Sequence, residues 1–386
     1  LNHDLMVRMV CCMLVKLDSV TWFQEGPGVR NYQYTDSGTK LINVTNLGKK
    51  FLELDKTSRF ISNEEANSKY KHFLCDNGDL VIASSGINEE SLIKKVSFVR
   101  SEDLPLCMNT SVIRFKVIDK NKLNINYLYY FFKSDSYRNQ IMKLMTGIAQ
   151  LNFGPSHLRK INLKLLDIKK QNECVNILDE IANLINLCEN QLIFFDELIK
   201  SRFIEMFGDP ITDTKWIQKP LSEVCDVRDG THYSPKYHPE GYPFVTSKNI
   251  TGGEIDFTTC KFISKEDYEN FNRRSCVDDG DILMPMVGTV GGAIVVIKDR
   301  EFSIKNVALI KFNKTNINNI FVKYILNSDE MNDYFGNIKK GGTQQFLSLI
   351  TIRNIPTIVP PLHLQNEFAD FVKQIDKSKF IVQKRI

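Results

Sequence analysis

Residues 174–210 read CVNILDEIANLINLCENQLIFFDELIKSRFIEMFGDP and predict one long helix in the middle of the 386-residue chain. Apolar side chains recur in it at alternating spacings of four and three, which is the heptad seam of a coiled coil. Gly208 and Pro210 favour an end to the helix, because glycine commonly follows the last turn and proline cannot continue it. The predicted seam consists of Leu178, Ile181, Ile185, Cys188, Leu192, Phe195 and Ile199.

A second, shorter stripe of the same kind closes the chain. It follows Pro360-Pro361, which can open a helix, and it consists of Leu364, Phe368, Phe371, Ile375 and Val382. The simplest way to bury two apolar seams in one chain is for the two helices to pair with each other. Because a compact domain connects them, an antiparallel pairing is geometrically easy. We therefore expect a long antiparallel two-helix coiled coil, in which the central helix is about 60 Å long at 1.5 Å per residue.

The segments that precede the two helices repeat one another. FIS at residues 60–62 returns at 262–264, and NGDL at 77–80 returns as DGDI at 279–282. Four further matches keep the same order: NTSVIRF at 109–115 with NVALIKF at 306–312, GIAQ at 147–150 with GTQQ at 342–345, LRKI at 158–161 with IRNI at 352–355, and QNE at 171–173 with QNE at 365–367. Ordered matches over such a length indicate two tandem copies of one unit.

Each copy combines a globular part with a helix, which predicts an α+β fold. The globular parts contain short β-like runs between Gly, Asn and Asp residues, at 80–83, 112–115, 282–284, 293–297 and 307–312. One amphipathic helix is expected in each, over residues 125–142 and 320–335. The predicted domains are an uncertain N-terminal segment at 1–16, globular domains at 17–166 and 209–359, a central helix at 167–208 and a shorter distal helix at 360–386.

Composition narrows the class of protein only broadly. A hydrophobic content of 42% and a charged content of 25% are typical of a folded protein, and the formal net charge of +4 permits a DNA partner without requiring one. The nine cysteines are scattered and form no CxxC pair, which favours reduced thiols in a cytoplasmic protein over a disulfide framework. Because no apolar stretch approaches membrane-spanning length, we expect no membrane association.

Signals for catalysis are missing from the sequence. It contains no GxxxxGK[ST] phosphate loop, no HExxH motif and no close His/Cys pair of the kind that binds zinc. The Asn/Asp-Pro-Pro-aromatic step of DNA methyltransferases is also absent, since Pro360-Pro361 lacks both flanking residues. We therefore predict no catalytic, cofactor-binding or metal site in this chain.

Polar and basic residues in the predicted loops are candidates for DNA contact, with an ordinary solvated turn as the alternative at each position. Lys and Arg suit phosphates, whereas Asn, Gln and Thr suit base edges. Lys305 and Arg114 are interpreted as phosphate contacts or simple surface charges. The candidates are Arg30, Tyr32, Thr45, Asn46, Gln150 and Asn152 in the first copy, and His232, Tyr233, Lys236, Ser247, Lys248, Asn249, Lys339, Lys340, Gln344 and Gln345 in the second.

The tandem layout resembles the specificity subunits of type I restriction-modification systems, over nearly the whole chain. Three motifs carry the resemblance: LSEVCDVRDG at 221–230, the Gly-Asp-hydrophobic step at Gly78 and Gly280, and IPTIVPPLHLQ at 355–365. The first copy departs from the family pattern, because KLLDIKKQ at 164–171 stands where the family has a double proline.

The resemblance implies two target recognition domains, each reading one half of a split site in double-stranded DNA. The paired helices would then act as spacer and as docking surface for two methyltransferase subunits, which restriction subunits join. S-adenosylmethionine, ATP and magnesium would belong to those partners, and this chain would be a non-catalytic cytoplasmic subunit of the endonuclease and methyltransferase complex. Two alternatives stay open: a fragment of a single-chain restriction-methyltransferase whose catalytic part lies outside this sequence, and a structural protein whose two heads bind protein or carbohydrate.

Overall fold

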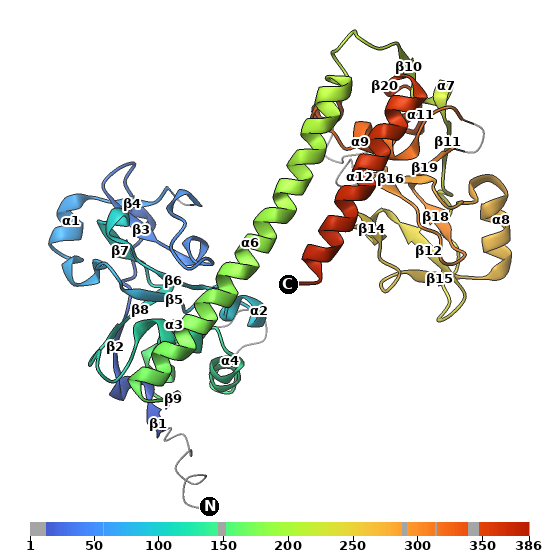
Figure 1. Cartoon of the computed structure of the whole chain (residues 1–386). Coiled ribbons are helices and arrows are strands. Elements are labelled where there is room, and N and C mark those ends of the chain that lie inside the picture. Colours follow the sequence, from blue (N-terminus) through green and yellow to red (C-terminus); the bar gives the residue numbers. More distant parts are fainter. Residues whose placement is uncertain are drawn as a thin grey trace, which may run out of the picture. The chain divides into compact units, whose positions relative to one another are not determined.

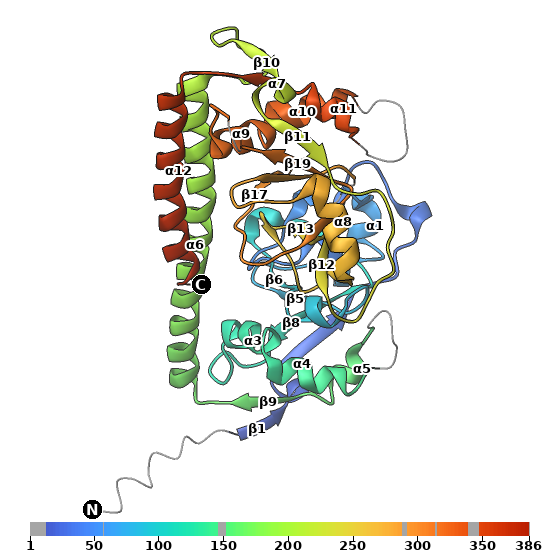
Figure 2. The same cartoon turned by 90° about the vertical axis from the view of Figure 1, so that its right-hand side faces the viewer.

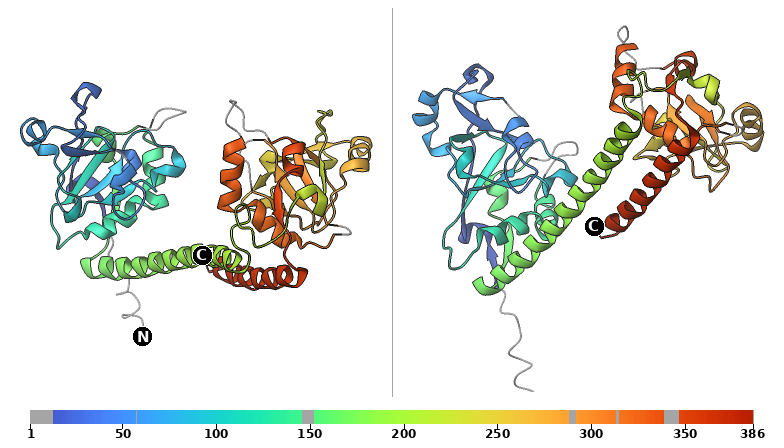
Figure 3. Two further views of the ribbon diagram at one scale, coloured as in Figure 1. Left: turned by 90° about the horizontal axis from the view of Figure 1, so that it is seen from above. Right: turned by 45° about the horizontal axis from the view of Figure 1, so that its top comes forward.

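The computed structural model describes residues 13–56, 58–145, 152–287, 292–312, 315–338 and 347–385. The chain divides into two compact units, unit 1 at Leu1–Leu184 and unit 2 at Ile185–Ile386. The long helix α6 (Ile168–Phe207) contributes its first part to unit 1 and its second part to unit 2 (Figure 1). In each unit the long helix lies along one side of a globular part built from small sheets (Figure 3).

The described residues of unit 1 form three sheets. The largest has the order β2-β8-β5-β6 and is antiparallel throughout, a second has the order β4-β3-β7 with β3 and β7 parallel, and β1 pairs with β9. The strands are β1 (Met13–Lys16), β2 (Thr21–Glu25), β3 (Thr39–Ile42), β4 (Phe60–Ile61), β5 (Leu80–Ala83), β6 (Val96–Phe98), β7 (Leu106–Met108), β8 (Val112–Val117) and β9 (Asn162–Leu165).

Unit 2 repeats this topology. Its sheets have the orders β11-β19-β16-β17, β15-β12-β18 and β10-β20, with one added hairpin of β13 and β14. The same strand order in both units confirms the tandem repeat and the α+β fold. The strands are β10 (Gln218–Pro220), β11 (Asp226–Asp229), β12 (Tyr242–Thr246), β13 (Ile250–Thr251), β14 (Glu254–Ile255), β15 (Lys261–Ile263), β16 (Ile282–Pro285), β17 (Ile294–Val295), β18 (Ser303–Lys305), β19 (Val307–Lys311) and β20 (Pro356–Ile358).

Short helices surround these sheets. Unit 1 has α1 (Asn63–Asn67), α2 (Glu89–Leu92), α3 (Ile125–Phe132), α4 (Asp135–Met142) and α5 (Pro155–Leu158). Unit 2 has the short helices α7 (Leu221–Val224), α8 (Lys265–Ser275), α9 (Asn319–Leu326), α10 (Asp329–Ile338) and α11 (Leu349–Arg353), together with the long helix α12 (Leu362–Gln383).

The single amphipathic helix that the sequence predicts in each copy is in fact two helices. The hydroxyl of Ser134 accepts a hydrogen bond from the backbone N–H of Tyr137, and the hydroxyl of Ser328 accepts one from the N–H of Met331. Serine at this position starts a new helix, because its side chain satisfies an N–H that has no partner inside the helix. The prediction of one continuous helix over 125–142 and one over 320–335 was therefore wrong, because each segment contains a break between two helices.

The Gly-Asp-hydrophobic step forms the turn that leads into β5 and β16. Gly78 and Gly280 adopt positive φ angles of 84° and 81°, which glycine reaches without strain. The following aspartates, Asp79 and Asp281, each accept a hydrogen bond at 2.8 Å from the backbone N–H three residues earlier. The same turn in both units is the structural reason for the repeated motif.

Buried cations face these two aspartates. Lys311 contacts Asp281 at 2.7 Å in unit 2, and Arg114 contacts Asp79 at 3.4 Å in unit 1. Arg114 is only 6% exposed and also donates to the carbonyl of His72, so it supports the fold and is not available to DNA. This corrects the interpretation of Arg114 as a surface charge or phosphate contact.

Strand pairing also corrects one repeat match. In unit 1 Phe115 lies opposite Leu80, and in unit 2 Ile310 lies opposite Ile282. Phe115 is thus structurally equivalent to Ile310. The sequence match of NTSVIRF with NVALIKF instead pairs Phe115 with Phe312, which lies two residues further along the chain. The shift arises where the chain passes between sheets, because residues 109–111 join β7 to β8 whereas Asn306 alone joins β18 to β19.

The two long helices pack antiparallel within unit 2 (Figure 2). Arg202 of α6 bonds Glu367 of α12 at 2.9 Å, and Asp196 bonds Lys379 further along, so the helices run in opposite directions. Of the predicted seam, Ile199, Phe368 and Val382 are buried, and Cys188, Leu192, Phe195, Leu364, Phe371 and Ile375 are half-buried. This contact confirms the predicted pairing of the two helices.

The first part of the predicted seam is not covered. Leu178, Ile181 and Ile185 are 37%, 47% and 36% exposed. A physical reason lies in the helix lengths, since α12 has 22 residues and α6 has 40. The prediction of a seam along the whole of α6 therefore holds only for its second part.

Each long helix is fastened to its globular part by the same buried glutamine. Gln171 accepts a hydrogen bond from the N–H of Asn124 at 2.9 Å, and Gln365 accepts one from the N–H of Asn318 at 2.9 Å. Both glutamines are fully buried and also donate to backbone carbonyls. The repeated QNE sequence thus marks the junction between helix and globular part.

Candidate nucleic-acid interface

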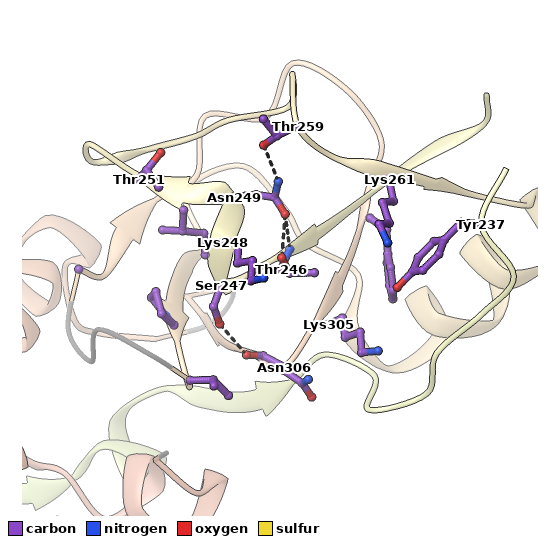
Figure 4. Close-up of a pocket in the computed structure, with 15 residues that line it drawn as sticks. Tyr237, Thr246, Ser247, Lys248, Asn249, Thr251, Thr259, Lys261, Lys305 and Asn306 are labelled. Atoms are coloured by element: carbon purple, nitrogen blue, oxygen red, sulfur yellow. Dashed lines mark hydrogen bonds between the residues drawn. The ribbon is translucent and has the colours of Figure 1, made fainter. Parts of the chain in front are cut away.

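A cleft of about 770 Å³ opens in unit 2 between β12, β15 and the junction of β18 and β19 (Figure 4). Three lysines, Lys248, Lys261 and Lys305, line it, and the described lining residues include no aspartate or glutamate. Hydroxyl and amide side chains, among them Thr246 and Asn306, alternate with the lysines. A concave surface with net positive charge and several hydrogen-bonding groups suits a polyanion whose edges also present donors and acceptors.

A tight turn after β12 shapes one wall of the cleft. The buried Asn249 accepts hydrogen bonds from the N–H and the hydroxyl of Thr246, at 3.0 and 2.8 Å. These bonds fix the turn and leave Lys248 exposed at its apex, with Ser247 half-buried beside it. Ser247 donates to the backbone carbonyl of Asn306 at 3.2 Å, which ties the turn to the β18–β19 junction.

Unit 1 contains the same turn after β3. Asn46 is fully buried, accepts from the N–H of Asn43 at 2.9 Å and donates to the carbonyl of Glu53 at 2.9 Å. Thr45 is the exposed residue at its apex. Asn46 and Asn249 therefore shape the turns from inside, and DNA contact by either side chain stays a prediction.

A cation that stacks on a tyrosine recurs in both units. The amino group of Lys261 lies 4.3 Å from the ring centroid of Tyr237, and the guanidinium of Arg59 lies 5.4 Å from that of Tyr34. Such contacts hold a charged side chain in a fixed direction. Sequence reasoning missed both cations, although a basic residue directly precedes the repeated FIS in each copy.

The segment after β11 brings His232 to the edge of the cleft. Its Nε2 atom lies 2.9 Å from a carboxylate oxygen of Asp229, and its Nδ1 atom lies 2.6 Å from the amide oxygen of Asn306. Arg274 also bonds Asp229. Tyr233 and Lys236, the neighbouring candidates, are exposed.

A glycine lets this segment pass close to the β18–β19 junction. A Cβ atom on Gly230 would lie 2.4 Å from the carbonyl oxygen of Ile304, and one on Gly26 would lie 2.2 Å from that of Asn109. Any larger residue would push the two backbones apart, because real atoms do not approach this closely. The glycines are thus part of the shape of each site.

The other candidates divide into exposed residues and residues outside the described chain. Arg30, Tyr32 and Asn152 are exposed in unit 1, with Tyr32 at 85%. Gln150, Lys339, Lys340, Gln344 and Gln345 lie outside the described residues.

Across the described ranges, no three His, Cys, Asp or Glu side chains come together as a metal site requires. Burial raises the pKa of Cys107 and of Cys225 to about 12, so these thiols are poor nucleophiles at neutral pH. Among the helices that the structure describes, none combines the length and the apolar character needed to cross a membrane.

Comparison with known proteins agrees with this architecture. A family model described as "Type I restriction modification DNA specificity domain" matches residues 17–193 and again 214–386. A curated relative, the type I restriction enzyme MjaVIII specificity subunit of Methanocaldococcus jannaschii, is 23% identical over 282 residues, which cover 68% of this chain. The chain spans 66% of the length of that relative.

Two solved structures share the fold. The S subunit of the type I restriction-modification system from M. genitalium superimposes with a TM-score of 0.53 at 14% identity, covering 98% of this chain and 92% of that one. A chain from a structure on complex assembly and conformational transition of the type I R-M system superimposes with a TM-score of 0.56 at 15% identity, covering 97% and 92%.

Proposed function

Because the chain belongs to the family of type I restriction-modification DNA specificity domains, we propose that it is the subunit that reads the DNA site for such a complex. The lysine-lined cleft of unit 2 is the observation that carries the proposal. Its lysines suit DNA phosphates, and its hydroxyl and amide groups suit base edges.

The duplicated topology supports a site in two halves. Each unit places an exposed turn apex, a cation held on a tyrosine and a close-packed glycine at corresponding positions of its sheets. Two structurally equivalent heads with different side chains suit two different half-sites in one duplex. We therefore propose that unit 1 reads one half of a split site and unit 2 the other.

The long helices are proposed to dock partner subunits. Ile193 and Phe194 of α6 are each 61% exposed, and Phe380 and Ile381 of α12 are 56% and 55% exposed. Apolar side chains at this exposure favour contact with another protein. We propose two methyltransferase subunits and restriction subunits as partners, with S-adenosylmethionine, ATP and magnesium bound by those subunits in the cytoplasm.

Mapping of methylated bases in host DNA, with and without this gene, tests the proposal. We expect a split motif with a fixed spacer that appears only when the gene is present. A triple variant, in which Lys248, Lys261 and Lys305 are all changed to Ala, removes three positive charges from the cleft and should abolish the motif. If the wild-type gene produces no dependent motif, or if the triple variant leaves the motif intact, the proposed reading role of the cleft is wrong.

A further inference from the structure

Asn306 has a backbone conformation that sets it apart in the described chain. It is the one described residue other than glycine with a positive φ, at 52°. The conformation has a topological cause, since Asn306 alone joins β18 of one sheet to β19 of another. Asparagine tolerates the left-handed region better than most residues, but such positions persist only when their surroundings enforce them.

Neighbouring groups hold Asn306 on several sides. Its backbone carbonyl accepts from the hydroxyl of Ser247 at 3.2 Å, and its N–H donates to the carbonyl of Thr231 at 3.3 Å. Its side-chain oxygen lies 2.6 Å from Nδ1 of His232, whose other ring nitrogen lies 2.9 Å from Asp229. When Nδ1 carries a proton, it donates to the amide oxygen and sets the orientation of the amide group.

These contacts involve the amide oxygen of Asn306 and not its amide nitrogen. Among the described residues no hydrogen-bond partner reaches this atom. Asn306 belongs to the lining of the cleft, and Figure 4 shows its side chain beside Lys305. A donor that is oriented in advance and placed among lysines suits an acceptor on a base edge, such as N7 or O6 of guanine, N7 of adenine or O4 of thymine.

We propose that Asn306 is a specificity-determining residue of unit 2, which donates from its amide nitrogen to an acceptor atom on one base of the half-site. His232 is its positioning residue, because it holds the amide oxygen and so decides which end of the amide faces the DNA. This inference rests on the proposed function and adds to it the class of base-edge atom that is read.

The crossing between the sheets of unit 1 lacks this arrangement. There residues 109–111 make the crossing, and the amide of Asn109 is used internally. Its nitrogen donates to Asn43 at 2.9 Å, and its oxygen accepts from the N–H of Thr110 at 2.8 Å. The proposal therefore concerns only the half-site that unit 2 reads.

Asn306→Gly is the decisive variant. Glycine adopts a positive φ without strain, so the backbone crossing is kept while the amide is lost. The full chain in its complex is used to select duplexes from a library of random DNA, and the selected motif is read position by position. We expect the base preference at one position of one half-site to fall by about tenfold, while the other positions and the other half-site keep theirs.

Two further variants separate a reading role from a structural one. His232→Ala should weaken the preference at the same position, and His232→Gln, which can still donate to the amide oxygen, should restore part of it. Lys248→Ala should lower binding to all duplexes alike without changing the motif, as loss of a phosphate contact does.

The outcomes are distinguishable. If Asn306→Gly leaves the motif unchanged, or weakens every position of the half-site equally, Asn306 does not read a base and the inference is overturned. If the wild-type chain selects no motif at all, the proposed function fails first and the inference falls with it. Thermal unfolding of Asn306→Gly is measured in parallel and should occur at no lower temperature than in the wild type.

Discussion

Replacing Gln365 by Met should detach the start of α12 from its globular part. The side chain is fully buried, accepts from the N–H of Asn318 at 2.9 Å and donates to the carbonyl of Pro360 at 2.7 Å. Methionine preserves the length and much of the volume of the side chain but leaves both backbone groups without this partner. Each unpaired buried group costs about 1–3 kcal/mol. Because Asn318 is only half-buried, we expect a total loss of about 2–4 kcal/mol.

Urea unfolding of unit 2 measures this loss. Trp22 and Trp216 are the two tryptophans of the chain, and Trp216 lies in unit 2, where its indole donates to the carbonyl of Phe207 at 3.0 Å. In a Trp22→Phe background, tryptophan fluorescence therefore reports on unit 2 alone. Gln374→Met is the matched control, since Gln374 is exposed on the same helix. A loss below about 1 kcal/mol, or one equal to that of the control, would refute the fastening role of Gln365.

The remaining predictions use the same fluorescence readout. Phe368→Ala removes a buried ring in contact with three other aromatic rings and should lower the free energy of unfolding of unit 2 by about 3–5 kcal/mol; a loss under half of that would contradict the packing. Gly230→Ala forces a Cβ atom against the carbonyl of Ile304 and should lower the free energy of unfolding by about 1–3 kcal/mol. The control Gly336→Ala lies in helix α10, where a Cβ atom has open space, and should be neutral or stabilising. Equal effects of the two variants would contradict the close approach at Gly230. Lys311→Met should reduce the loss of stability that occurs at alkaline pH. A pH profile of stability identical to that of the wild type would contradict this prediction.

The alkaline effect follows from the surroundings of Lys311. Burial opposes its charged form, but the hydrogen bonds and charges of Asp278 and Asp281 outweigh burial and raise its pKa above the ordinary 10.5. A raised pKa in the folded state means that the ion contributes stability below the unfolded pKa and loses it as the pH rises through the folded pKa. The free energy of unfolding of the wild type should thus fall above pH 10.5, and part of that fall should be missing in the variant.

Buried strands and the long helix were predictable from the sequence because their patterns are local. The run LVIA at 80–83 forms the fully buried β5, and the run at 282–284 lies within β16. The break between α3 and α4 was not predictable from periodicity, since Ser134 fits the polar face of an amphipathic helix as well as it fits a helix start. Only packing against the rest of the unit distinguishes the two.

The candidate site was predictable in outline and not in detail. Of the predicted candidates, Ser247, Lys248 and Asn249 line the cleft. A polar residue in a turn can face inward or outward, and Asn249 faces inward while Lys248 faces outward. Asn306 gave no local signal, because its role depends on a shortened crossing between two sheets and on a histidine that is distant in sequence. Such contacts arise from the tertiary fold alone.

The shared glutamine fastening keeps the attachment of each long helix separate from the surface that we propose to read DNA. In both units the long helix is joined to the globular part through one glutamine and one asparagine pair, Asn124 with Asn172 and Asn318 with Asn366, at 2.7 and 3.0 Å. The residues that line the cleft take no part in this joint. Substitutions in the loops that we propose to face DNA should therefore leave this joint, and the attachment of each long helix, intact.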